Sequence, residues 1–410
     1  MSQFWKITAI ACLFPLAVSA QEDQSGGVSV SFGIDQRFDA NSDTDLSTPE
    51  AEQGFTGLTS LRFGALTETR TERFSIDLST SLRLTEDASE SGDTSLRFAY
   101  GRDSADSALA LSARTTRSDI AFLRSASDFV DADGTLVLPD DFDDLVGTGT
   151  RSVTLLGASL RWGETDPVGY SVGVNQEILR YSGAAATLLD RTITGVDTGL
   201  RLNINQVTTA RINLNFSQTD EDESSREDRI SLRGGLTFER PLGDLTGQFA
   251  ATRVDDGDLF WSASLGRNIT LADQSFDGLL GVTEDGDGDV AVRGSVGYSR
   301  ALSRGQVGLR ANSEVDSGEA LRKTTVQANY SFEVNPLQNL QFSFTYGRSE
   351  DSDDNSDLAT ASLSAAYGIR LTSDVQVNLG ASASQRDDNG VRSDNQSVFI
   401  TLGRSFTRRP

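Results

Sequence analysis

The sequence predicts an all-β fold: a transmembrane, antiparallel, up-and-down β-barrel of about 20 strands, within a range of about 18–22. From about residue 28 onward, runs of about ten residues alternate apolar with polar side chains, as a strand with two different faces does. The connections between the runs alternate between compact turns and longer acidic segments. No helices or long apolar strands are expected to cover the apolar faces, which indicates that lipid covers them.

The alternation is clearest in four runs, at residues 74–84, 230–238, 290–298 and 340–346. In the first run Phe74, Ile76 and Leu78 share one face, while Ser75 and Asp77 lie on the other. In all four runs charge is confined to the second face. A soluble β-sandwich alternates in the same way, so this pattern alone does not decide between the two folds.

The connections favour the barrel. Compact turns are expected at residues 103–107, 164–167, 206–209, 240–244, 270–274 and 371–374. Acidic loops are expected between them, at residues 86–93, 220–228, 255–258, 284–289, 349–357 and 386–395. Outer-membrane barrels have short periplasmic turns and longer external loops, whereas a sandwich has no reason to sort its loops by charge.

Aromatic residues are expected to form a girdle at the turn end of the strands. They fall near the ends of strands that run toward the short turns: Tyr100, Trp162, Phe238, Tyr298, Phe332 and Phe406. Such rings favour the membrane–water interface. The alternative is the general preference of aromatic residues for strands.

Composition excludes several function classes. The net charge of -24 argues against a nucleic-acid partner. Histidine is absent, which removes Ser-His and Cys-His nucleophilic sites and most zinc sites, so we expect no enzyme, no catalytic residue, no cofactor and no metal. The acidic run at residues 284–289 resembles a calcium loop only superficially, and solvation of the outer surface is the simpler interpretation.

Residues 1–20 are expected to be a cleaved signal peptide, with Lys6 before an apolar segment and Ala20 before the cleavage site. The single cysteine, Cys12, lies inside this segment, and lipidation there is a minor alternative. A short lead, 21–27, precedes the barrel domain, 28–406, and a C-terminal extension, 407–410. The shortness of the lead argues against a plug domain.

The last strand resembles the terminal strand of Gram-negative outer-membrane barrels. Val398, Ile400 and Leu402 share one face with Phe406, an aromatic residue near the C-terminus. In that family the aromatic is usually the final residue, whereas four residues follow it here. The resemblance implies outer-membrane location, contact with lipid and lipopolysaccharide, recognition by the barrel assembly machinery, and a homo-oligomer as in many porins. It identifies no subfamily.

The longest connection, about 118–150, is the candidate pore constriction. It interleaves apolar residues with eight aspartates: Asp119, Asp128, Asp131, Asp133, Asp140, Asp141, Asp143 and Asp144. Porins are similar in having an acidic loop inside the lumen opposite arginines. The arginines expected on the lumen wall are Arg83, Arg97, Arg114, Arg161, Arg201, Arg211, Arg233, Arg293 and Arg310. The alternatives are that the loop caps the outside and that these arginines only pair with wall carboxylates.

These features predict a porin-like channel for passive diffusion of small hydrophilic solutes, with selection by size and charge. The alternative function is a barrel that exports a polysaccharide with a periplasmic partner, or that anchors the surface.

Overall fold

The computed structural model describes residues 27–41, 54–84, 89–120, 123, 125–130, 135–142, 145, 149–183, 188–222, 226–255, 257, 259–285, 288–315, 321–351 and 356–408. The expected signal peptide, with Lys6 and Cys12, lies outside these residues, as does most of the expected lead.

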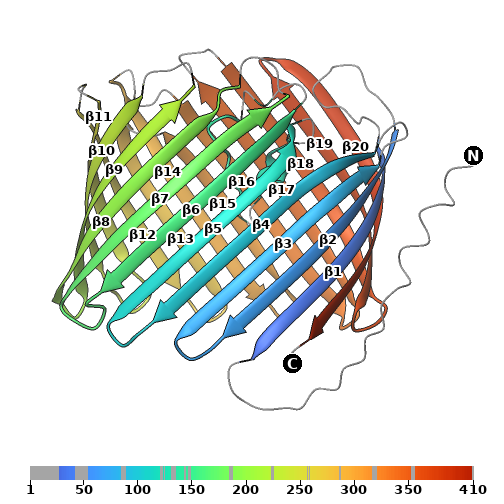
Figure 1. The fold of residues 1–410 in the computed structure, drawn as a ribbon, viewed down its shortest axis with the longest axis horizontal. Coiled ribbons are helices and arrows are strands. Elements are labelled where there is room, and N and C mark those ends of the chain that lie inside the picture. The colour runs from blue at the N-terminus through green and yellow to red at the C-terminus, as the bar shows by residue number, and fades with distance from the viewer. Residues whose placement is uncertain are drawn as a thin grey trace, which may run out of the picture.

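The chain forms one 20-stranded antiparallel sheet that closes into a barrel, because β1 pairs with β2 on one side and with β20 on the other. Every other strand pairs with its neighbours in sequence, which gives the up-and-down order (Figure 1). The strands are β1 (Val28–Asn41), β2 (Gly54–Glu68), β3 (Glu72–Leu84), β4 (Ser89–Asp103), β5 (Ser107–Asp119), β6 (Thr150–Trp162), β7 (Val168–Ser182), β8 (Arg191–Asn205), β9 (Thr208–Glu221), β10 (Glu227–Phe238), β11 (Leu245–Val254), β12 (Leu259–Thr270), β13 (Gln274–Glu284), β14 (Val290–Leu302), β15 (Gly305–Val315), β16 (Leu321–Asn335), β17 (Gln338–Asp351), β18 (Ser356–Arg370), β19 (Val375–Asp388) and β20 (Val391–Arg408).

The predicted fold class is confirmed: the barrel is all-β, antiparallel and up-and-down, and has the expected strand count. The first strand begins at Val28, where the alternation begins. The last strand continues through Thr407 to Arg408, two of the four residues assigned to a C-terminal extension. Both of these residues pair with β1, opposite Ser31 and Val30.

Each predicted compact turn follows an even-numbered strand, and these turns gather at the lower end of the barrel in Figure 1. At the other end, several strands extend into the segments predicted as acidic loops. The clearest case is 386–395, where β19 and β20 are joined by only Asn389 and Gly390. Both residues have positive φ, 50° and 87°, as the tightest hairpin turn requires, so the pairing continues to the turn.

The two faces of the sheet differ as the alternation predicts. Large apolar side chains are exposed on the outer face; Leu232, Leu265 and Leu280, for example, are 51%, 68% and 67% exposed. A continuous band of exposed apolar side chains around a closed barrel indicates contact with lipid. Among the described residues, no helix is both long enough and apolar enough to cross a membrane.

The predicted girdle residues lie at the turn ends of β4, β6, β10, β14, β16 and β20. Trp162 stacks on Tyr170 of the neighbouring strand, with ring centroids 5.6 Å apart. Tyr330 packs in the same way beside Phe332 and Phe342, at 6.5 and 6.1 Å. The rings therefore pack together at the turn end of the barrel, and their place at the membrane–water interface stays a prediction.

Buried apolar side chains are concentrated inside the barrel and not between layers. Most belong to the long connection between β5 and β6, which includes the short 3-10 helix η2 (Ala126–Phe129). The only densely packed part of the described molecule is thus the segment predicted to enter the pore.

Candidate pore constriction

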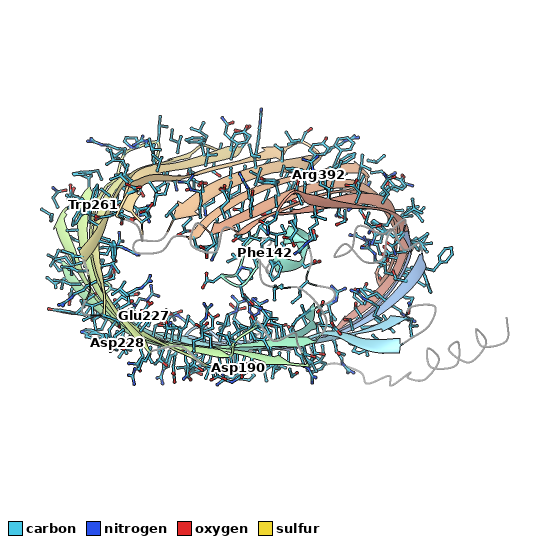
Figure 2. All side chains as sticks on the ribbon, turned by 90° about the horizontal axis from the view of Figure 1, so that it is seen from above. Phe142, Asp190, Glu227, Asp228, Trp261 and Arg392 are labelled. Carbon is cyan, nitrogen blue, oxygen red and sulfur yellow. The ribbon has the colours of Figure 1, made fainter. Side chains whose placement is uncertain are left out.

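The connection between β5 and β6, residues 120–149, folds into the barrel. Its two ends lie side by side, because Asp119 and Thr150 are cross-strand partners. Figure 2, which looks along the barrel, shows a flattened ring with Phe142 between its two long walls. The segment therefore leaves the wall at β5, crosses the short axis of the lumen and returns to β6. We call residues 120–149 the crossing loop.

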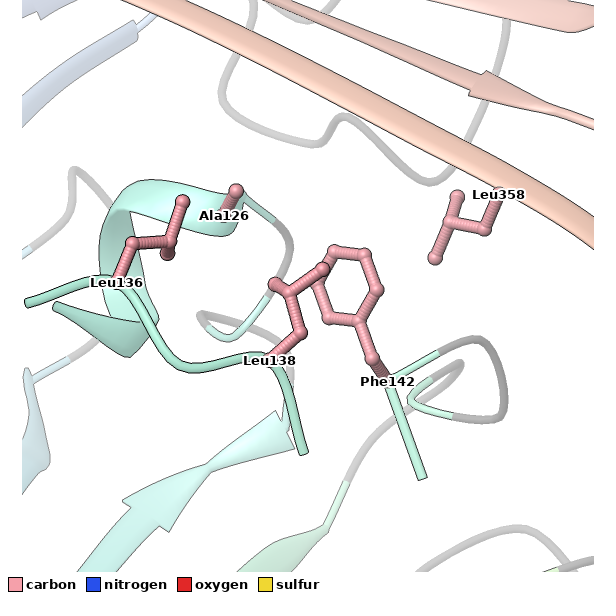
Figure 3. Close-up of a cluster of buried hydrophobic side chains, with 5 residues drawn as sticks. All are labelled: Ala126, Leu136, Leu138, Phe142 and Leu358. Atoms are coloured by element: carbon pink, nitrogen blue, oxygen red, sulfur yellow. The ribbon is translucent and has the colours of Figure 1, made fainter. Parts of the chain in front are cut away.

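One end of the crossing loop packs on the far wall. Ala126, Leu136, Leu138 and Phe142 form a buried cluster with Leu358 of β18 (Figure 3). All five side chains are at most 7% exposed, and Phe142 is fully buried. Burial of these side chains provides the driving force for docking on β18.

Backbone contacts fix this packing. The Ala126 amide donates to the Thr360 hydroxyl of β18 at 2.9 Å, in a buried hydrogen bond. On β17, Gly347 leaves the space that the loop fills, since a Cβ there would lie 2.8 Å from the Ala126 Cβ. A capping box between Ser125 and Asp128 begins η2, so the helix presents Ala126 to the wall.

A second apolar cluster holds the near side of the crossing loop. Ile120, Leu123 and Leu145 are buried together, and Tyr181 of β7 packs against them. Phe129 contacts both clusters, and its ring meets Phe142 edge-on at 5.4 Å. One continuous apolar core therefore connects the two walls across the lumen, near the end of the barrel opposite the compact turns.

Asp140 forms ion pairs with both long walls. Its carboxylate accepts from Arg191 of β8 at 3.0 Å and also pairs with Lys323 of β16. Partial burial opposes the charged form of Asp140, but Lys323 and Arg191 outweigh it and hold the pKa of the carboxyl below its usual range. Lys323 is the only lysine after Lys6.

Asp141 anchors the near side. Arg151 of β6 donates two hydrogen bonds to its carboxylate, both at 2.7 Å, in the fork geometry that suits this pair. The hydroxyl of Tyr181 donates to the same carboxylate. The Arg151 and Asp141 side chains are each only 11% exposed, so this pair is shielded from water and ions.

Four of the eight predicted constriction aspartates are described. Asp140 and Asp141 hold the loop to the walls, and Asp128 caps η2. Asp119 is the last residue of β5. Both Asp119 and Asp128 interact electrostatically with Arg83. Asp131, Asp133, Asp143 and Asp144 lie outside the described residues.

The nine predicted wall arginines are spread along the lumen. Arg83 lies beside η2, in the same cavity as Asp128, and Arg310 donates to Thr135 of the loop at 2.9 Å. Arg97 and Arg114 are cross-strand partners in a separate cavity. Three of the remaining five lie near the compact turns: Arg161 pairs with Glu164, Arg201 donates to backbone carbonyls of the 163–167 turn, and Arg211 donates to the Thr237 hydroxyl. The other two lie further from the turns. Arg233 is exposed, and the buried Nε of Arg293 has no hydrogen-bond partner in the described part of the chain.

The sequence pattern does not identify the cations that hold the crossing loop, Arg151, Arg191 and Lys323. All three lie at the end of their strands opposite the compact turns, where the alternating pattern fades into the acidic segments. The lone lysine was the one available indication, because every other basic residue after the leader is arginine. Gly347 could not have been singled out among 38 glycines.

No group of metal-ligating side chains is found among the described residues. The described carboxylates Asp140 and Asp141 are instead paired with Arg191, Lys323 and Arg151 of the walls. The arrangement can narrow an aqueous path and shape its electrostatic field.

Comparisons with known proteins support the fold. No protein-family model and no curated protein matches the chain. Among solved structures, the ferric enterobactin receptor PfeA of Pseudomonas aeruginosa is similar with a TM-score of 0.55 at 10% identity, covering 94% of this chain and 82% of that one. The siderophore receptor PirA of the same organism has a TM-score of 0.51 at 10% identity, covering 94% and 81%. OccK5 (OpdH), also from Pseudomonas aeruginosa, has a TM-score of 0.40 at 11% identity, covering 93% and 98%. The two receptor matches show that the chain has the closed-barrel fold of outer-membrane proteins.

Proposed function

We propose that this protein is an outer-membrane channel through which small hydrophilic solutes diffuse, and that the crossing loop sets the width of the path. The observation that carries the proposal is the attachment of this loop to both long walls of a closed barrel. A barrel of this strand number leaves an aqueous interior unless a segment fills it.

The attachment argues for a constriction built into the folded state. Two apolar clusters and two carboxylates fix the loop on opposite walls, so it does not hang into the lumen by one end. The alternative, a loop that caps the outer surface, does not account for the packing of Phe142 against Leu358 and of Ala126 on Thr360 of β18.

Among the described residues, the wall contributes more to charge selection than the loop does. Asp140 and Asp141 are matched by Lys323, Arg191 and Arg151, so their net field is small. Positive charge on the wall comes from the exposed Arg233 and, in another part of the lumen, from the neighbouring Arg97 and Arg114, which share their cavity with Asp77. We therefore propose that the pore discriminates by size first and by charge second.

Planar-bilayer recording of the purified protein, with a salt gradient across the membrane, tests the proposal. Stable ohmic steps support a diffusion pore, and the reversal potential reports the sign of the field. A folded barrel, identified by its heat-dependent gel mobility, that never conducts would refute it. That result would favour the rival function of export with a periplasmic partner.

A further inference from the structure

One stretch of the lumen wall differs in chemistry from the rest. On β16 to β19, the inward-facing positions at mid-height are occupied by hydroxyl and amide side chains in place of arginine and carboxylate. Six of them line one cavity next to η2: Gln327, Ser343, Thr345, Ser362, Ser364 and Ser382. We call these six residues the hydroxyl panel.

The hydroxyl panel is organised in cross-strand pairs. Ser343 bonds to Ser364 at 2.7 Å, and Thr345 bonds to Ser362 at 2.7 Å, on the same two strands. Each hydroxyl has one donor and two lone pairs. One internal hydrogen bond leaves a pair with about one free donor and three free lone pairs. The panel is therefore rich in acceptors and suits a solute that brings several O–H donors.

The charges around this cavity largely compensate one another. Arg37 makes a two-point ion pair with Asp39 and lies over the Phe399 ring, 4.0 Å from its centroid. Arg83 interacts electrostatically with Asp128 and Asp39. A charged solute would have to compete with these internal pairs, whereas a neutral solute leaves them in place.

The crossing loop closes the cavity on the side away from the wall, through Ser125, Ser127, Asp128 and Val130. The cavity has a volume of about 550 Å³, within the range of small-molecule sites. It combines a hydroxyl-rich wall, compensated charges and partial enclosure at the constriction.

We propose that this cavity is a binding site for a neutral polyhydroxylated solute of saccharide size, which the channel passes through its constriction. The inference rests on the proposed function for the role of the site in transport. The binding itself follows from the acceptor-rich panel and stands on its own.

Saturation-transfer NMR on the detergent-solubilised protein tests the binding without requiring conduction. The probes are glucose, its anionic counterpart gluconate and its cationic counterpart glucosamine. The variants are Thr345→Val, which keeps the side-chain shape, and Ser364→Ala. The control is Ser79→Ala, which removes a hydroxyl from an equivalent pair with Ser95, at 2.8 Å, outside this cavity.

We expect saturable glucose binding that exceeds that of gluconate and glucosamine. Its dissociation constant should rise about fivefold in each panel variant, because each loses one hydrogen-bond partner, and should not change in the control. Absence of glucose binding, equal affinity in the panel variants and wild type, or tighter binding of a charged probe would overturn the site. Glucose binding by a protein that never conducts would reject the diffusion pore and keep the binding site.

Discussion

Replacement of Asp140 by asparagine tests how the crossing loop is held. Asp140→Asn keeps the size of the side chain and removes the charge that pairs with both Arg191 and Lys323. The Asp140 side chain is 48% exposed, so water screens both ion pairs. Exposed pairs of this kind contribute about 0.2–1 kcal/mol each. The two together stabilise the docked loop by about 1 kcal/mol, or about a fivefold change in the docking equilibrium.

Single-channel recording measures this equilibrium directly. We expect the Asp140→Asn channel to visit states of larger conductance about five times as often as wild type. The apolar clusters remain, so the smaller conductance should still dominate. The matched control is Asp273→Asn, which removes the charge of a similarly exposed carboxylate that pairs with Arg300 at 3.6 Å in a compact turn far from the loop.

A double-mutant cycle isolates the pair that spans the lumen. Lys323→Gln should reproduce part of the Asp140→Asn effect, and the double variant should be no more open than Asp140→Asn. Unchanged opening statistics in Asp140→Asn, or fully additive effects of the two substitutions, would refute the idea that this ion pair holds the loop.

The pH dependence follows from the same carboxyl. Its pKa is lower in the docked loop than in a free aspartate, so protonation disfavours docking. The stabilisation is fully present above the ordinary pKa of about 4 and is lost as the pH falls through the lowered value. Opening of the wild-type channel should be constant from neutral pH down to about 5 and rise below about 4, while the rise should be smaller in Asp140→Asn.

Three further predictions concern packing and turns. Gly347→Ala should push η2 off β17 and raise the single-channel conductance without lowering barrel stability. The control Gly308→Ala adds a Cβ that meets no atom within 4 Å, so its conductance should equal that of wild type. Bilayer recording measures the conductance of both variants. Phe142→Ala should cost about 3–5 kcal/mol of loop packing and expose the loop to proteinase K added to intact cells, and protection equal to wild type would contradict this. Gly390→Val places a branched side chain at φ 87° and should destabilise the β19–β20 hairpin by about 1–2 kcal/mol, seen as a lower urea midpoint in detergent; an unchanged midpoint would show that the turn tolerates it.

The barrel could be predicted from the sequence because its rule is local. Alternation with a period of two places each side chain on one face, and the order of turns and loops gives the up-and-down connectivity. The strand count was predictable for the same reason. The ends of the strands were less predictable. In residues 386–395 the charge indicated a loop, but the Asn389-Gly390 turn lets β19 and β20 pair up to Asp388 and Val391.

The crossing loop was predictable as a segment but not in its contacts. Its mixture of apolar residues and aspartates indicates that part of the loop packs against another part of the protein, and this follows from the amino-acid composition alone. Its partners Leu358, Thr360 and Lys323 lie some 180 residues or more further along the chain, as the 183-residue separation of Asp140 and Lys323 shows. No local pattern reports such a distance. The predicted arginine wall was chosen by alternation alone, which says nothing of height in the barrel and so missed the cations that bind Asp140 and Asp141.

The most direct test of the constriction compares single-channel conductance of the wild-type protein with that of a variant lacking residues 128–144. The deletion removes Phe142 and both anchoring carboxylates, and because Asp119 and Thr150 are cross-strand partners, the shortened connection still closes without strain on the barrel. We predict a larger conductance and weaker size exclusion of neutral polymers in the deletion variant. An equal conductance in a barrel with wild-type heat-dependent mobility would show that the crossing loop does not limit the pore.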